Sequence, residues 1–290
     1  MILAFAALPL IQPGFRLFLL LGIYGGLLVG GLLAGVAVLM QLARHPPDWS
    51  ARVRELTTRP LNDRFILVYT AGVLVLWVAG AGFSVAVLRQ GSWAWHESAG
   101  PLIHGVFFHG LGLLGLAGYI RRRGLSWGRA FGIGSESFVC HAGRAIILYL
   151  AVMPVVITVG LVFSLFLWWF GYPLEFQDVV NLFRRGLPQP ALGAMIMMVL
   201  VMAPVFEELL FRGLGLPLLT RRLGLAPAIV LTSFLFAVAH LHLMSFPQLF
   251  VLAAAFSLAY VATGSLLIPI LMHALFNGVN LGLLWLVTAE

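Results

Sequence analysis

Eight long apolar runs dominate the sequence and decide the solvent in which the chain folds. Each comes near or exceeds the roughly 20 apolar residues that a helix needs to cross a bilayer. Hydrophobic residues make up 61% of the chain and charged residues only 9%, whereas soluble domains carry about 25% charged residues. We therefore predict an all-α, polytopic integral membrane protein, with residues 1–290 in one domain and about eight transmembrane helices. The predicted spans cover roughly residues 17–43, 65–87, 99–120, 145–170, 192–220, 226–242, 247–264 and 266–287.

The arginines predict how these spans are oriented. All 17 basic residues are arginine, and twelve of them fall in three loops, 44–64, 121–144 and 221–225. Four lie in loops of the opposite side, namely Arg16, Arg89, Arg184 and Arg185. Because cytoplasmic loops carry an excess of basic residues, we expect the three arginine-rich loops in the cytoplasm and both termini outside. The net charge of +7 is then explained by the arginines of these loops. We predict a multi-pass protein of the cell membrane and do not expect a nucleic-acid partner.

Three shorter segments are predicted to lie at the membrane interface. Residues 1–13 are apolar but short, and we interpret them as an interfacial lead-in without a cleaved signal peptide. The loop 44–64 and the stretch 126–142 combine tryptophan with arginine, a composition typical of the headgroup zone. The single cysteine, Cys140, excludes an intramolecular disulfide framework and a cysteine-based metal site.

An acidic pair lies where the bilayer should tolerate it least. Among the ten acidic residues, only Glu207 and Glu208 fall inside an apolar span. A charged side chain at mid-bilayer costs at least about 2.5–3.5 kcal/mol, so a partner is expected. Arg212 follows Glu208 at i,i+4, about 40° round the helix, whereas Glu207 lies about 140° from Arg212. The spacing predicts a Glu208–Arg212 pair and leaves Glu207 facing another helix.

The following span supplies a partner for Glu207. The run from Arg221 to Pro227 contains a glycine and a proline that are typical of a helix end, a tight turn and a new helix. Glu207 lies 13 residues before Thr220, and His240 lies 13 residues after Pro227. Each is therefore about 20 Å from the turn, and the two side chains are expected to meet.

The last span brings further polar groups to the same depth. His273 and Asn277 are separated by four residues and share one helix face, as do Phe236 and His240. Five polar groups that converge in an apolar region indicate a functional site. The remaining histidines are interpreted as structural or loop residues, namely His45, His96, His104, His109, His141 and His242.

This constellation points to hydrolysis. Glu207 and His240 can activate a water molecule as a general base, and His273 and Asn277 can donate hydrogen bonds to a tetrahedral oxyanion. No serine or cysteine lies in the cluster to act as a nucleophile. Glu207, His240 and His273 are also a candidate ligand set for zinc, but no H-E-x-x-H motif is present. No cofactor is certain; direct activation of water is favoured, and a metal remains the alternative.

The three motifs together resemble a known family. Glu207-Glu208-x-x-x-Arg212, Phe236-x-x-x-His240 and His273-x-x-x-Asn277 resemble the motifs of the CAAX prenyl protease and bacteriocin-processing (CPBP, or Abi) family of intramembrane endopeptidases, over a core of about residues 190–283. The resemblance implies an eight-helix fold, a catalytic cavity open to the cytosol, water activation by Glu207 and His240, and an oxyanion site at His273 and Asn277. Arg212 and Phe236 would support them.

The predicted function is therefore cleavage of a peptide bond in a membrane-associated or prenylated-type protein near the cytoplasmic leaflet. Two other classes of protein would use the same residues differently. A non-catalytic immunity or scaffold protein would keep the cluster as a structural network. A proton-coupled transporter would need a polar path across the whole bilayer, and the first four spans offer few polar groups beyond His104 and His109.

Overall fold

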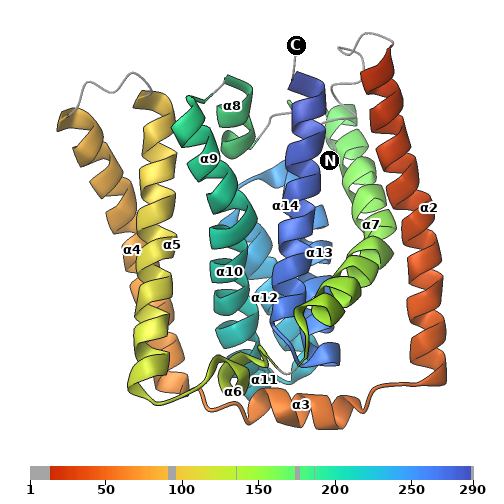
Figure 1. The fold of residues 1–290 in the computed structure, drawn as a ribbon, viewed down its shortest axis with the longest axis vertical. Coiled ribbons are helices and arrows are strands. Elements are labelled where there is room, and N and C mark those ends of the chain that lie inside the picture. The colour runs from red at the N-terminus through yellow and green to blue at the C-terminus, as the bar shows by residue number, and fades with distance from the viewer. Residues whose placement is uncertain (1–13, 91–95, 135, 174–176, 186, 289–290) are drawn as a thin grey trace.

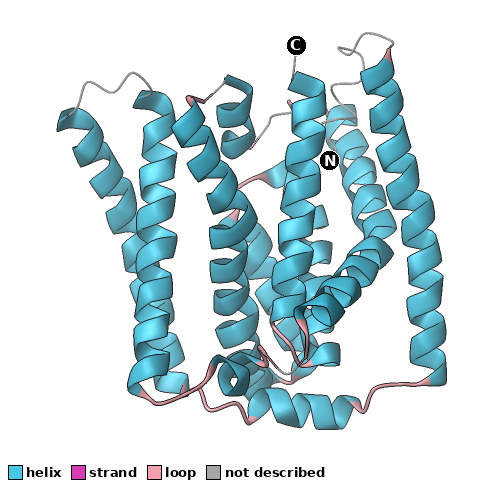
Figure 2. Cartoon of the chain, in the orientation of Figure 1, coloured by secondary structure: helices cyan, strands magenta, loops and turns pink. Residues whose placement is uncertain are grey.

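The protein is a bundle of long helices joined by short connections (Figures 1 and 2). The computed structural model describes residues 14–90, 96–134, 136–173, 177–185 and 187–288, and every regular element within them is a helix. Seven helical segments are long and apolar enough to cross a membrane. This confirms the all-α polytopic fold. The predicted lead-in at residues 1–13 lies outside the described residues.

Six of these seven segments are single helices that match predicted spans. They are α2 (Phe15–Arg44), α4 (Asp63–Gln90), α5 (His96–Arg122), α7 (Phe138–Trp169), α13 (Phe246–Thr263) and α14 (Leu267–Thr288). α7 begins earlier than predicted, because the Ser137 side chain caps its first turn by accepting a hydrogen bond from the Cys140 backbone. His141, which was predicted to lie in a loop, is therefore a buried residue of α7.

The seventh segment carries the acidic pair and has an irregular backbone. It runs through α9 (Gln189–Met197), η2 (Met198–Met202), α10 (Ala203–Glu208), η3 (Leu209–Gly215) and α11 (Leu216–Leu223), where η2 and η3 are π-helical turns. We call this continuous segment the motif helix. A proline, Pro204 or Pro217, follows each π turn and removes a backbone donor from the helix ladder. Such π turns are frequent at functional sites.

The predicted span 226–242 forms a shorter helix than expected. α12 (Leu225–Ala239) has 15 residues, which is about 22 Å against a hydrocarbon core of about 30 Å. The chain then passes through η4 (Leu243–Ser245) into α13. In Figure 1, α12 ends well below the upper ends of α9 and α14. His240 consequently caps the end of a helix in the middle of the bundle.

The three arginine-rich loops gather at one end of the bundle, which is the lower end in Figure 1. They carry the short helices α3 (Trp49–Thr57) and α6 (Trp127–Phe131) and the turn at Gly224. Arg59 links this end by donating to the carbonyl oxygens of Ala130, at 3.2 Å, and Gly264, at 2.6 Å. Gly132 has a φ of +71° and packs against the Gly264 carbonyl, where a Cβ would overlap it. We call this end the arginine-rich face.

Packing on both sides holds the motif helix in place. α10 and η2 contact α14, and α5 packs against α9, η2 and α10 from the other side. Gly105 and Gly112 of α5 allow this approach, because a Cβ on either would overlap Met198 or Phe206. A short helix, α8 (Asp178–Arg185), precedes the motif helix and contributes Leu182 to the same apolar cluster as Met198.

Candidate active site

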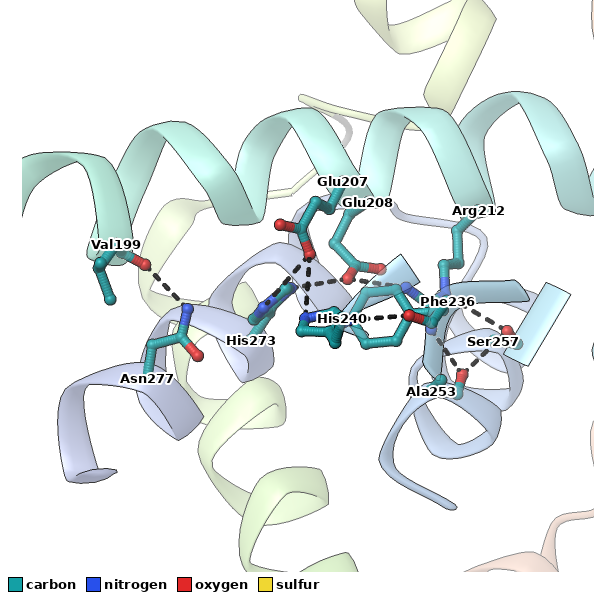
Figure 3. A network of polar contacts seen from close by, with 10 residues as sticks. All are labelled: Val199, Glu207, Glu208, Arg212, Phe236, His240, Ala253, Ser257, His273 and Asn277. Atoms are coloured by element: carbon teal, nitrogen blue, oxygen red, sulfur yellow. Dashed lines mark hydrogen bonds and ion pairs between the residues drawn. The ribbon is translucent and has the colours of Figure 1, made fainter. Parts of the chain in front are cut away.

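Three helices bring the predicted polar residues together in the interior of the bundle (Figure 3). Glu207 and Glu208 end α10, His240 caps α12, and His273 and Asn277 project from α14. Figure 3 shows the two glutamates pointing from the motif helix towards His240 and His273. The spatial arrangement expected from helix geometry is therefore present, while the catalytic roles of these residues remain predictions.

Glu208 lies in a closed ionic network. Its side chain is fully buried, and its Oε1 accepts hydrogen bonds from Arg212 Nη1 and from His273 Nδ1, each at 2.9 Å. The predicted i,i+4 pair between Glu208 and Arg212 is thus an ion pair with both side chains at 0% exposure. Removing one partner of such a buried pair leaves an uncompensated charge. Glu208 therefore orients His273 and is not accessible to a substrate.

Arg212 is held by groups that the motif spacing did not indicate. On α13, the Ala253 carbonyl oxygen accepts from Arg212 Nη2 at 2.9 Å, and the Ser257 hydroxyl accepts from Nε at 3.4 Å. The guanidinium also lies over the Phe236 ring, 4.6 Å from its centroid, and near the Phe256 ring at 5.4 Å. Such cation–π contacts strengthen when they are desolvated.

Glu208 Oε2 is buried without a hydrogen-bond partner, and Glu207 differs from Glu208 in being partly exposed and in facing two imidazole nitrogens. Glu207 Oε2 is likewise buried without a hydrogen-bond partner, 4.0 Å from His240 Nε2 and 3.9 Å from His273 Nε2. The side chains of Glu207 and His240 are 21% and 26% exposed. A water molecule that makes hydrogen bonds of about 2.8 Å can bridge atoms at these separations. One carboxylate oxygen and two imidazole nitrogens thus face a common point.

The hydrogen bonds define the tautomers of both imidazoles. His240 Nδ1 lies 2.8 Å from the Phe236 carbonyl oxygen, which can only accept, so Nδ1 carries a hydrogen. His273 Nδ1 likewise donates to the Glu208 carboxylate. In each neutral ring Nε2 therefore presents a lone pair towards Glu207. Nε2 of either histidine becomes a donor only in the imidazolium form.

Asn277 compensates for a defect in the motif helix. The Ala203 N–H donates to Met198 in the π turn, and the next residue, Pro204, has no N–H. The Val199 carbonyl is left without its helical donor, and Asn277 Nδ2 donates to it at 2.8 Å. This contact positions α14 against the motif helix. The Asn277 amide has a second N–H, which does not take part in this hydrogen bond to Val199.

The two histidines of α5, His104 and His109, make different contacts from those of His240 and His273. His104 Nε2 lies 3.0 Å from the Trp77 carbonyl oxygen, which agrees with a structural role. His109 Nδ1 contacts the Gly105 carbonyl oxygen at 2.8 Å, and its ring packs edge-on against Phe206 at 5.1 Å between centroids. His109 therefore packs against Phe206, the neighbour of Glu207 in the chain, and supports the motif helix.

The two separations at Glu207 Oε2 are wider than those of a tetrahedral zinc site. Glu207, His240 and His273 have suitable donor atoms, but Glu207 Oε2 lies 4.0 Å and 3.9 Å from the two imidazole nitrogens. With zinc bonds of about 2.0–2.1 Å, these separations would require oxygen–zinc–nitrogen angles near 150° instead of about 109°. Among the described residues, no group of three His, Cys, Asp or Glu side chains has the spacing of a metal site. The observed separations suit a bridging water.

Comparison with protein families agrees with this geometry. Residues 189–279 match the family model described as type II CAAX prenyl endopeptidase Rce1-like. Over this segment, less than half of the chain, the sequence is similar to that family. The matched segment contains the acidic pair, Arg212, Phe236, both histidines of the site and Asn277. No curated protein and no solved structure shows significant similarity to the chain. The chain therefore combines seven helical segments that could cross a membrane with a segment that is similar to a family of membrane proteases.

Proposed function

We propose that the protein is an intramembrane endopeptidase in which Glu207 and His240 activate a water molecule for attack on a peptide bond. One observation supports this most directly. Glu207 Oε2 is buried without a hydrogen-bond partner, within 4.0 Å of two imidazole nitrogens. A buried carboxylate oxygen normally has a partner, and a water held at this point would provide one.

The proposed mechanism requires Nε2 of His273 to donate a hydrogen bond. The carboxylates of Glu207 and Glu208 and the guanidinium of Arg212 sum to one negative charge, which is costly in an apolar interior. A proton on His273 makes the cluster neutral and turns its Nε2 into a donor. The water can then accept from His273 while it donates to Glu207 Oε2 and His240 Nε2, which satisfies every group that faces it.

The reaction follows from this arrangement. One water proton passes to Glu207 and His240, which act together as the general base. The hydroxide oxygen then bonds to the carbonyl carbon of the substrate. The negative charge that develops on the carbonyl oxygen is stabilised by hydrogen bonds from His273 and from the second N–H of Asn277. The C–N bond then breaks, and the leaving amine takes the transferred proton. No metal takes part in these steps.

The substrate we propose is a protein or peptide that reaches the site within the membrane. The name of the matched family refers to CAAX prenyl proteins, so a lipidated, prenylated-type segment is one class to test. The exposed apolar surfaces of the surrounding helices, including Phe234 at 47% and Leu235 at 46% on α12, are suited to lipid contact.

The function is tested by cleavage of a fluorogenic peptide library, with and without a prenyl group, by the purified protein. Glu207→Ala and His240→Ala are expected to abolish cleavage, whereas His104→Ala is the matched control because its imidazole contacts Trp77 away from the site. Cleavage that survives Glu207→Ala would refute the assignment. Loss with a chelator and recovery with zinc would refute the metal-free mechanism. A folded wild type that cleaves no peptide would favour the scaffold alternative.

A further inference from the structure

The residue that follows His240 has a strained backbone. Leu241 has a φ of +48°, and every other described residue with a positive φ is a glycine. This left-handed conformation is unfavourable for a residue with a Cβ. The Leu241 side chain is 75% exposed, so its own contacts with the protein do little to offset the strain. The segments on either side must therefore hold Leu241 in this conformation.

The segment before Leu241 is the fixed end of α12. The Leu241 N–H donates to the Val238 carbonyl oxygen at 2.9 Å, and His240 Nδ1 lies 2.8 Å from the Phe236 carbonyl oxygen. Phe236 is fully buried and packs against the Arg212 guanidinium. These contacts hold His240 at the end of the helix.

The segment after Leu241 is anchored to distant parts of the chain. Ser245 of η4 is 4% exposed, and its Oγ accepts a hydrogen bond from Gln177 Nε2 at 2.7 Å and lies 2.7 Å from His242 Nδ1. The neighbouring Met244 is 3% exposed and packs in an apolar cluster with α7. We call Gln177, His242 and Ser245 the polar brace.

Only two residues, Leu241 and His242, lie between the cap of α12 and η4. Two fixed segments are therefore joined by a very short link, and Leu241 takes up the strain. The position of the His240 backbone depends on both ends of this link.

Gln177 connects the polar brace to the motif helix. Its backbone carbonyl accepts hydrogen bonds from the N–H groups of Val180 and Asn181, at the start of α8. Leu182 of α8 shares an apolar cluster with Met198 of η2, and η2 directly precedes α10 and the acidic pair. The polar brace thus links the helix that ends at His240 to the helix that carries the two glutamates.

We infer that the polar brace is a positioning device that sets the separation between His240 Nε2 and Glu207 Oε2. The inference rests on the proposed peptidase function and adds to it residues outside the three motifs. With the brace intact the separation is 4.0 Å, which one water molecule can bridge. Without the brace, Leu241 is free to leave the left-handed conformation, and the adjacent His240 moves with it. A displacement of about 1 Å is enough to lower a rate by about 10²-fold.

The kinetics of a peptide that the wild type cleaves test this role. Ser245→Ala removes the centre of the brace and is expected to lower kcat by about 10–10²-fold, while KM stays near the wild-type value. The matched control is Ser84→Ala, because Ser84 is buried and its hydroxyl donates to Ala81 within α4. Gln177→Leu removes the same hydrogen bond at a partly exposed position. It should lower kcat in the same way, even if Ser245→Ala does not fold.

A suppressor variant tests the strained link. Glycine adopts the left-handed conformation without a steric cost, so after Leu241→Gly the loss of the brace releases no strain. The double variant Ser245→Ala/Leu241→Gly is therefore expected to cleave about tenfold faster than Ser245→Ala. A general loss of packing would not be repaired in this way, because glycine also makes the unfolded chain more flexible.

Nitrogen NMR of protein with isotope-labelled histidine reports on His240 without any cleavage. The ring resonances of His240 are assigned from their absence in His240→Gln. They should move in Ser245→Ala and stay in place in Ser84→Ala. The polar brace is thus judged separately from the peptidase assignment, which fails if Glu207→Ala leaves cleavage intact.

A wild-type kcat in both Ser245→Ala and Gln177→Leu would overturn the inference. Unchanged His240 resonances in Ser245→Ala would overturn it as well. So would a double variant that cleaves no faster than Ser245→Ala, because Leu241 would then not be the strained link.

Discussion

The two neighbouring carboxylates of α10 lie in opposite surroundings. The region around Glu208 is closed, with an ion pair, a histidine and aromatic rings at 0% exposure of the carboxylate. The region around Glu207 is partly open, and the Glu207 oxygen that faces two imidazoles has no partner. Oε2 of each glutamate is buried without a hydrogen-bond partner, but Glu208 is fixed through the two hydrogen bonds to its Oε1. A network of this kind fixes geometry, whereas an unpaired group next to accessible space can bind and react. From this difference we propose that Glu208 stabilises the site and that Glu207 takes part in the chemistry.

The largest effect is expected on the open side. His240→Gln should lower the cleavage rate by about 10²–10⁴-fold, because it removes a group that shares the water proton. Its thermal unfolding midpoint should stay near that of the wild type, since His240 is partly exposed and its Nδ1 forms a hydrogen bond within its own helix. Initial rates and unfolding curves in detergent check both statements. A large loss of stability would place His240 in the closed network.

The closed side should show the reverse pattern. Glu208→Gln is expected to destabilise the fold by about 3–5 kcal/mol, because it leaves the buried Arg212 charge unpaired. The free energy of unfolding in detergent measures this. The double variant Glu208→Gln/Arg212→Met should recover part of the loss, since no buried charge then lacks a partner. A stable Glu208→Gln protein would contradict the proposed division between the two carboxylates.

The contact between α14 and the motif helix should contribute less to the free energy of unfolding than the buried ion pair does. Asn277→Ala leaves the Val199 carbonyl without a donor, at a cost of about 1–3 kcal/mol. In a Pro204→Ala background the residue at position 204 can donate to that carbonyl, so the same substitution should cost clearly less. A double-mutant cycle measured by unfolding gives the coupling energy. Equal costs in both backgrounds would mean that Asn277 does not compensate for the proline.

The smallest expected effect concerns the packing of α5. Gly112→Ala introduces a Cβ that overlaps the Phe206 ring, and overpacking of this kind costs about 1–3 kcal/mol. The gain in helix propensity offsets up to about 1 kcal/mol of this. Gly110→Ala on the same helix is the matched control, because nothing lies within 4 Å of its added Cβ. Equal stability of the two variants would show that α5 does not closely support the acidic pair.

Sequence periodicity anticipated much of this site. The i,i+4 spacing predicted the pairing of Glu208 with Arg212, and equal distances from the turn at Gly224 predicted the approach of Glu207 to His240. Both are local or hairpin relations, in which residue counts translate directly into depth. The apolar runs likewise predicted the helices, with the exception of the length of α12.

Other features depend on contacts between distant segments. The role of Asn277 required knowledge of the π turn, which moves the Ala203 donor from Val199 to Met198. Pro204 alone did not indicate which carbonyl would be left free. The hydrogen bonds from Arg212 to α13 arise from packing between helices that no spacing rule relates.

The cleavage rate of a folded Glu207→Gln protein tests the central claim most directly. The amide keeps the size of the side chain but cannot take a proton from water. If Glu207 is the base, the rate should fall by about 10²–10⁴-fold while the unfolding midpoint stays near that of the wild type. A folded Glu207→Gln protein that cleaves at the wild-type rate would contradict the assignment of the chemistry to the open carboxylate.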